Sequence, residues 1–149
     1  MKILCSISTR GRYEYYLPMS IMSVIQQTRK PDHLTIYDDN DKPIDLRNIE
    51  VYQYLFQLLD EKKIGWDVVF GQKKGQHFND EMANTSGYDY VWRIDDDCIA
   101  EPDVLEKLIS QMTKDVGAVG GSILTPPLWE SNDKSSSIDK LDAQNKQWF

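Results

Sequence analysis

The sequence has few of the residues that build disulfide frameworks, zinc sites and membrane spans. Its 149 residues include two cysteines and two histidines. Cys5 and Cys98 have no metal-ligand spacing, which disfavours a disulfide scaffold or a zinc site. Apolar stretches such as 118–124 are far shorter than the roughly 20 residues that cross a bilayer, and no signal peptide is apparent. We therefore expect a cytoplasmic location, either free or at the membrane periphery, and no transmembrane segment.

Basic residues are also in the minority. The chain has 17 Lys and Arg against 24 Asp and Glu, a net charge of −7 at pH 7, and its longest basic run is the pair Lys73 and Lys74. An acidic surface repels phosphate backbones, so nucleic acid is not an expected partner. An anionic ligand would have to be held by a local basic group or through a divalent cation.

Strand and helix patterns alternate along the chain, whose length predicts one compact domain. The apolar, β-branched and aromatic runs predict strands over 2–8, 33–37, 66–70, 88–94 and 116–124. Apolar residues at helical spacing predict helices over 17–27, 46–62 with Asp45 as its cap, 77–85 and 102–112. This order predicts an α/β fold with a mainly parallel sheet and functional loops at the carboxyl ends of its strands.

The composition changes after Pro126 and Pro127. The segment that follows is polar and has too few apolar residues for a core element. We predict a domain over 1–126 and a polar tail over 127–149, which is either mobile or dependent on a partner and would begin the acceptor region of a longer protein.

Three adjacent carboxylates, Asp95, Asp96 and Asp97, follow the fourth predicted strand. Neighbouring carboxylates repel one another unless a cation or solvent compensates them. Mg²⁺ or Mn²⁺ bound by one or two carboxylates keeps positions open for water and phosphate, which suits a diphosphate ligand. A solvated acidic turn is the alternative.

A second acidic group, Asp38 and Asp39, ends the second predicted strand. It is not an EF-hand, because Pro43 and Ile44 stand where that loop needs a side-chain oxygen and a glycine. A carboxylate at this place can accept hydrogen bonds from a nucleobase or ribose. A turn stabilised by local hydrogen bonds is the alternative for the residues that follow.

The loop over 71–76 matches neither the dinucleotide fingerprint nor the phosphate-binding P-loop. Lys73 or Lys74 could still approach a phosphate, although a solvated lysine pair is the alternative. His77 is a further candidate at the same loop.

In their order along the chain, these motifs resemble the inverting glycosyltransferases of family 2, which have a GT-A fold. The resemblance covers residues 2 to about 124. The matching segments are the opening loop ISTRGR at 7–12, the helix SIMSVIQQTRKP at 20–31, LTIYDDND at 34–41, Gly75 with Asn79, and the triplet 95–97 with Pro102.

The resemblance implies a three-layer αβα sandwich and assigns roles to residues. Thr9 and Asp39 would contact the nucleobase, Asp95 or Asp96 the ribose and sugar, and Asp97 with Asp95 the metal, Mn²⁺ or Mg²⁺. The residues assigned to the nucleotide sugar are Thr9, Arg10, Asp38, Asp39, Lys74, Asn79, Asp95 and Asp96.

The implied activity is metal-dependent hexosyl transfer, with inversion, from a nucleoside diphosphate sugar to a hydroxyl of a glycan, lipid or protein. A UDP-sugar is the favoured donor. Phe78 stands where the family commonly has an arginine, so the phosphate contact would come from Lys74, His77 or elsewhere. No general base is apparent after Leu124, and a non-catalytic or truncated nucleotide-binding domain is the alternative.

Overall fold

The computed structural model describes residues 1–70 and 74–123. The chain divides into two compact units, Met1–Ser110 and Gln111–Phe149. The sheet and the candidate site belong to the first unit, and the second is described only over residues 111–123. The predicted boundary at residue 126 and the predicted tail lie outside the described residues.

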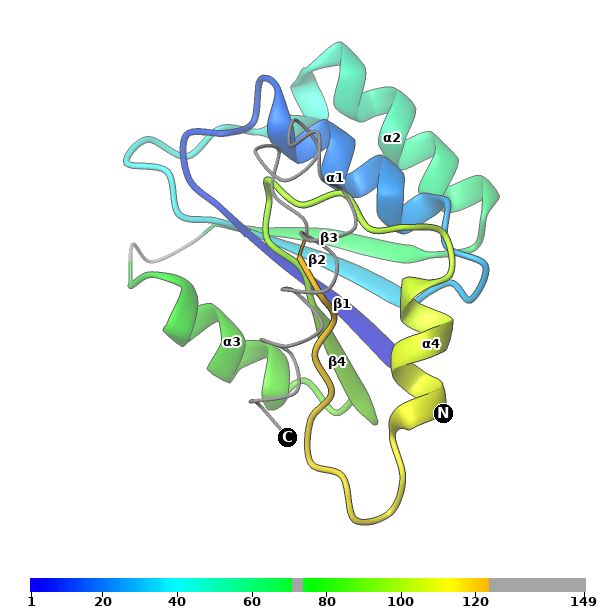
Figure 1. The fold of residues 1–149 in the computed structure, drawn as a ribbon. Helices are drawn as coiled ribbons and strands as arrows, with labels where there is room; N and C mark the ends of the chain where they lie inside the picture. The colour runs from blue at the N-terminus through cyan, green and yellow to red at the C-terminus, as the bar shows by residue number, and fades with distance from the viewer. Residues whose placement is uncertain (71–73, 124–149) are drawn as a thin grey trace, which may run out of the picture. The chain divides into compact units, whose positions relative to one another are not determined.

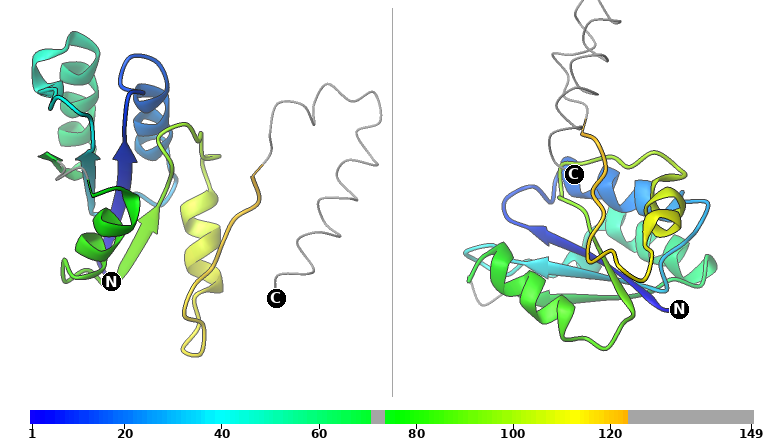
Figure 2. Two further views of the ribbon diagram at one scale, coloured as in Figure 1. Left: turned by 90° about the vertical axis from the view of Figure 1, so that its left-hand side faces the viewer. Right: turned by 60° about the horizontal axis from the view of Figure 1, so that its bottom comes forward.

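A parallel sheet forms the centre of the first unit (Figure 1). Its strands, in the spatial order β3-β2-β1-β4, are β1 (Ile3–Thr9), β2 (His33–Asp38), β3 (Gly65–Phe70) and β4 (Tyr90–Arg93). β1 and β2 are buried along almost their whole length, as expected for central strands covered on both faces. The strand arrows in Figure 2 point toward the same end. The predicted parallel sheet is therefore confirmed.

Helices cover both faces of this sheet. α1 (Tyr16–Ile25) and α2 (Glu50–Glu61) lie on one face and α3 (Gln76–Asn84) on the other (Figures 1 and 2). Leu105 of α4 (Val104–Gln111) packs into the same core as α1 and α2. This arrangement confirms the predicted three-layer αβα sandwich. Over residues 1–70 and 74–123, no helix has the length and apolar character that crossing a membrane requires.

The helix predicted over 46–62 begins later than expected. The Asp45 side chain caps a short 3-10 turn, η1 (Leu46–Asn48), by accepting a hydrogen bond from the Arg47 backbone N–H. Ile49 is then extended, with φ −105° and ψ 125°, so α2 starts at Glu50. Asp45 is therefore a capping residue, as predicted, but it caps η1 and not α2, because the extended residue Ile49 separates these two elements.

The fifth strand predicted over 116–124 is wrong for the described part, residues 116–123, which form no strand. Gly117, Gly120 and Gly121 lie in this stretch and offer no side chain to pack. Most of residues 116–123 are exposed, so the apolar residues between the glycines lack the neighbours that would hold a strand. The fourth strand is also shorter than predicted, at Tyr90–Arg93.

The order of the strands creates a crevice at the carboxyl ends of β1 and β4. The chain runs from β1 to β2 and β3 on one side, whereas β4 lies on the other side of β1. Loops that leave neighbouring strands in opposite directions separate, and open α/β sheets bind ligands in the gap between them. The loop after β1 contains Arg10 to Tyr15, and the loop after β4 contains the acidic triplet.

Candidate functional site

An open cleft of about 590 Å³ occupies this crevice. It brings together residues from the ends of β1, β2 and β4 and from the start of α3. Its lining residues are Ser8, Thr9, Arg10, Arg12, Asp39, Lys74, Gly75, Gln76, Asp95, Asp96 and Asp97. The two acidic groups of the sequence therefore lie at one edge of the sheet, as the parallel order predicts.

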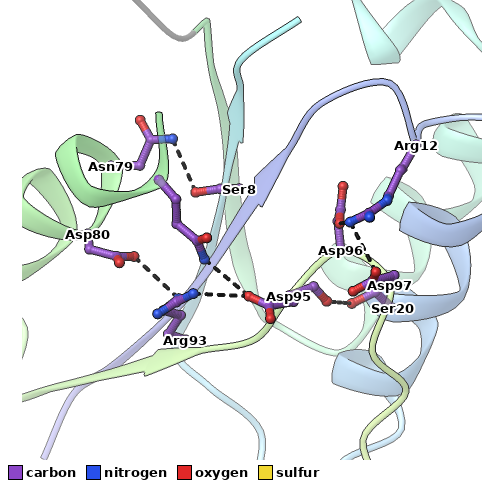
Figure 3. A network of polar contacts seen from close by, with 10 residues as sticks. Ser8, Arg12, Ser20, Asn79, Asp80, Arg93, Asp95, Asp96 and Asp97 are labelled. Atoms are coloured by element: carbon purple, nitrogen blue, oxygen red, sulfur yellow. Dashed lines mark hydrogen bonds and ion pairs between the residues drawn. The ribbon is translucent and has the colours of Figure 1, made fainter. Parts of the chain in front are cut away.

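Arg12 forms ion pairs with two of the three carboxylates in the triplet. Its Nη1 lies 2.8 Å from Asp96 Oδ1 and 3.0 Å from Asp97 Oδ2 (Figure 3). The hydrogen bond and charge of Asp96, with the charge of Asp97, raise the pKa of the Arg12 guanidinium. The Asp96 side chain is 6% exposed and that of Asp97 is 40% exposed. Both residues line the cleft, but Asp96 is a buried partner of Arg12, whereas Asp97 is more open to solvent.

Asp95 is held by a different set of contacts. Its Oδ1 accepts hydrogen bonds from Gln76 Nε2 at 3.1 Å and from Arg93 Nη2 at 3.2 Å. Its backbone carbonyl accepts a hydrogen bond from Ser20 Oγ of α1 at 3.1 Å (Figure 3). Arg93 also lies 3.7 Å from Asp80 of α3. Helices on both faces of the sheet therefore fix the first residue of the triplet.

The donor atoms of the triplet fit a hard divalent cation. One ligand atom each of Asp95, Asp97 and Cys98 lies within 4.8 Å of the others. Carboxylate oxygens are the ligands that Mg²⁺ and Mn²⁺ prefer. Burial, and then the charges of Asp95 and Asp97, raise the pKa of the Cys98 thiol, and sulfur is a softer donor than the oxygen ligands that these cations prefer. Asp95 and Asp97 are therefore the residues that could hold such a cation.

Asp38 and Asp39 have different environments although they are adjacent. Asp38 Oδ1 accepts hydrogen bonds from the backbone N–H of Asn40 at 2.8 Å and from its side chain at 2.6 Å. Asp38 Oδ2 accepts from the backbone N–H of Ile44 at 3.1 Å. Asp38 is buried and is not among the residues that line the cleft, so its carboxylate organises the loop after β2.

Asp39 lines the cleft and leaves one oxygen available. Its Oδ2 accepts a hydrogen bond from Asn79 Nδ2 at 2.7 Å, and the same amide lies 3.1 Å from Ser8 Oγ (Figure 3). Its Oδ1 is buried and has no hydrogen-bond partner. Asn79 itself is buried beneath the cleft. Asn79 therefore orients the Asp39 carboxylate rather than lining the cleft.

Thr9 provides a second unpartnered oxygen in the cleft. Its side chain is buried, its Oγ1 has no hydrogen-bond partner, and its backbone carbonyl accepts from the Asp39 N–H at 2.9 Å. A buried polar atom without a partner typically costs about 1–3 kcal/mol. Thr9 Oγ1 and Asp39 Oδ1 are two such atoms on neighbouring strand ends, and each could make a hydrogen bond to a polar ligand.

A sequence model described as glycosyl transferase family 2 matches residues 6–138, which include every residue of the cleft. The chain belongs to glycosyl transferase family 2. No curated protein sequence matches this member of the family.

Crystal structures of S. aureus TarS resemble this family 2 chain in fold. One aligns with a TM-score of 0.53 and 15% identity, over 89% of this chain and 26% of that chain. TarS 1–349 in complex with UDP aligns with a TM-score of 0.52 and 14% identity, over 74% of this chain and 31% of that chain. TarS 1–349 aligns with a TM-score of 0.53 and 13% identity, over 88% of this chain and 40% of that chain. The chain thus spans less than half the length of the TarS chains that it matches. At these identities the likeness shows the fold, which is the predicted GT-A fold.

Basic side chains at the cleft are arranged in a way that the family resemblance did not predict. Lys74 Nζ lies 4.4 Å from the centre of the Phe78 ring, so the aromatic residue that departs from the family pattern supports this lysine. Arg10 lines the cleft and pairs with the exposed Asp41 at 3.1 Å. Lys73 lies outside the described residues, and His77 is exposed and is not a lining residue of the cleft.

Sequence reasoning missed four polar residues of this family 2 site: Ser8, Arg12, Gln76 and Arg93. Two of them had a usable signal. Arg12 stands in the loop after β1, at the sheet edge that also receives the acidic triplet. Arg93 is the last residue of β4 and precedes Asp95 by two residues, so the sequence places a basic side chain close to the acidic triplet.

Proposed function

We propose that the cleft binds a nucleoside diphosphate sugar, with a UDP-sugar as the favoured donor, and that the chain is the donor-binding part of an inverting glycosyltransferase. The observation on which this proposal depends is the pair of unpartnered buried oxygens, Thr9 Oγ1 and Asp39 Oδ1, in the same cleft as the acidic triplet. Membership of family 2 and the UDP complex of TarS, which has the same fold, support it.

The two unpartnered oxygens match the edge of a uracil ring. Uracil presents an imide N–H between two carbonyl oxygens, so it can donate to Asp39 Oδ1 and accept from the Thr9 hydroxyl. Asn79 fixes Asp39 through its other oxygen, at 2.7 Å, and so leaves Oδ1 for the base. A preorganised acceptor of this kind favours a base with a matching N–H and disfavours one without it.

The acidic end of the cleft would hold the diphosphate. Asp95 and Asp97 are the proposed ligands of Mn²⁺ or Mg²⁺, which when bound would neutralise the departing diphosphate. Lys74 and Arg10, which also line the cleft, supply positive charge, and Asp96 remains paired with Arg12. No residue of this chain is assigned as the general base that would deprotonate the acceptor hydroxyl.

UDP is expected to bind at least tenfold more weakly in excess EDTA than in Mn²⁺, because an acidic cleft repels a diphosphate unless its carboxylates are neutralised. Isothermal titration calorimetry on the whole chain measures both affinities. Equal affinity in chelator would remove the cation from the proposal. A separate assay, the release of sugar from a UDP-sugar in the presence of Mn²⁺, would distinguish a transferase from a domain that only binds the nucleotide.

Asp39→Asn is expected to bind CDP in preference to UDP, the reverse of wild type, with a change of about tenfold in the ratio of the two affinities. The reason is that an amide can donate an N–H to cytosine N3, whereas the carboxylate can only accept a hydrogen bond. The amide oxygen can still accept the hydrogen bond from Asn79, so the fold should be kept. Competition titrations with the two nucleotides measure this preference. An unchanged ratio of affinities would place the base elsewhere.

A matched variant, Asp38→Asn, separates base recognition from loop structure. Asp38 lies next to Asp39 but accepts three hydrogen bonds within its own loop. Its substitution is therefore expected to lower the melting temperature without changing the ratio of UDP to CDP affinity.

A further inference from the structure

Arg12 contacts the same carboxylate that the proposed function assigns to the cation. One nitrogen, Nη1, lies within 3.0 Å of Asp97 and 2.8 Å of Asp96, and the residue also lines the cleft (Figure 3). A guanidinium and a divalent cation both seek carboxylate oxygens. Arg12 and a cation would therefore compete for Asp97.

The backbone that supports Arg12 is fixed on both sides. Gly11, with φ +71°, donates its N–H to Asn40 Oδ1 at 2.5 Å. The Arg12 carbonyl accepts two N–H groups at the start of α1, at 3.3 and 3.2 Å. The Tyr13 carbonyl accepts a hydrogen bond from the buried Tyr52 hydroxyl at 2.6 Å. A change of partner by the guanidinium would thus require rotation of the Arg12 side chain alone, which is half exposed.

The two carboxylates differ in how strongly they depend on Arg12. The Asp96 side chain is almost fully buried, so the loss of its counter-ion would leave an uncompensated buried charge. The Asp97 side chain is 40% exposed and is within 4.8 Å of the other potential ligands, so solvent or a cation can replace Arg12 there. Arg12 should therefore release Asp97 while it keeps Asp96.

We infer that Arg12 couples cation binding to nucleotide binding by exchanging Asp97 for the diphosphate. This inference rests on the proposed function. Without nucleotide, Arg12 holds Asp97 and opposes the cation. With both ligands present, Arg12 remains on Asp96 and directs its free N–H groups toward the diphosphate in the cleft, since a guanidinium can bind carboxylate and phosphate oxygens at once. The cation alone is then bound weakly, and cation and nucleotide favour each other.

In the absence of nucleotide, Arg12→Gln is expected to bind Mn²⁺ about fivefold more tightly than wild type. The substitution removes a guanidinium that competes with Mn²⁺ for Asp97, and the free energy of a half-exposed ion pair corresponds to a change in affinity of about this size. The measurement is the electron paramagnetic resonance signal of free Mn²⁺ during titration of the whole chain without nucleotide. The same variant should bind UDP more weakly than wild type at saturating Mn²⁺, by about fivefold.

Arg10→Gln is the matched control for charge. Arg10 stands in the same loop and also lines the cleft, but it pairs with the exposed Asp41 and not with the triplet. Its removal changes the net charge equally, so Mn²⁺ affinity without nucleotide should change by about twofold at most. An equal gain in both variants would attribute the effect to net charge and overturn the exchange.

A pair of further variants guards against loss of folding. Arg12→Gln leaves Asp96 buried without a counter-ion, whereas Asp96→Asn removes that charge. Mn²⁺ affinity is therefore also compared between Asp96→Asn and the double variant Arg12→Gln/Asp96→Asn. The double variant should bind Mn²⁺ more tightly than Asp96→Asn does. Weaker or unchanged Mn²⁺ binding on loss of Arg12, in both comparisons, would overturn the inference alone. Failure of wild type and all variants to bind Mn²⁺, with or without UDP, would overturn the proposed metal site and the inference with it.

Discussion

Replacement of Gln27 by leucine is expected to lower the free energy of unfolding by about 3 kcal/mol, because it removes a buried amide that joins α1 to α4. Gln27 is 1% exposed. Its Nε2 donates to the carbonyls of Ser23 at 3.1 Å and Glu101 at 2.8 Å, and its Oε1 accepts from the Leu105 N–H at 2.9 Å. Leucine has a similar size but would leave the carbonyl of Glu101 and the N–H of Leu105 without these partners.

The loss should also reach the candidate site. The segment that Gln27 holds, from Glu101 to Leu105, begins four residues after Asp97, the last residue of the acidic triplet. Ala100 is tied to α1 as well, through a hydrogen bond from its N–H to Ser23 Oγ at 3.1 Å. A loosened segment would lower the affinity for Mn²⁺ and UDP in addition to stability, since ligand geometry depends on the residues that support the ligands.

Gln26→Leu provides a control of identical chemistry at the adjacent position. Gln26 is exposed and only its backbone takes part in ending α1. Urea unfolding followed by circular dichroism should give a midpoint close to wild type for Gln26→Leu and a clearly lower one for Gln27→Leu. Equal midpoints for the two variants would contradict the role given to the Gln27 amide.

The sheet could be predicted because its information is local. Runs such as 2–8 and 33–37 are apolar and β-branched, and the helices between them oblige parallel pairing, which brings Thr9 opposite Asp38. The meeting of the two acidic groups at one edge follows from that topology. The prediction of a fifth strand was wrong because it rested on apolar content alone. A glycine-rich stretch forms a strand only where neighbouring elements pack against it.

The contacts within the site could not be predicted, because they join residues that are distant in sequence. Arg12 and Asp96 are 84 positions apart, and Asn79 and Asp39 are 40 apart. The different roles of Asp38, which bonds its own loop, and Asp39, which lines the cleft, could not be predicted either, since both residues stand at the end of the same strand. Which carboxylate turns toward its own loop depends on Asn40 and Ile44 offering N–H groups to Asp38, a matter of loop geometry rather than of residue type.

Asp97→Asn is expected to lower the affinity for UDP in Mn²⁺ to the value measured in chelator, a loss of at least tenfold, while it changes the free energy of unfolding by less than about 0.5 kcal/mol. The cation would lose a charged ligand and with it much of its hold on the diphosphate. The fold would lose little, because Asp97 is 40% exposed and Arg12 retains Asp96 as a partner at 2.8 Å. The relief of repulsion among three adjacent carboxylates offsets part of the lost ion pair.

The same substitution at Asp103 controls for charge, since Asp103 pairs with Lys107 at 2.8 Å and does not line the cleft. Asp103→Asn should therefore bind UDP in Mn²⁺ as wild type does. Melting curves of wild type and both variants, with and without Mn²⁺ and UDP, give stability and ligand binding in one experiment, because a ligand that binds only the folded state raises the melting temperature. If Asp97 were a structural residue of the turn, its variant would melt lower without ligand and keep the full shift with ligand. A metal ligand gives the opposite pair of results, so an Asp97→Asn protein that is destabilised yet still stabilised by Mn²⁺ and UDP would refute its assignment to the cation.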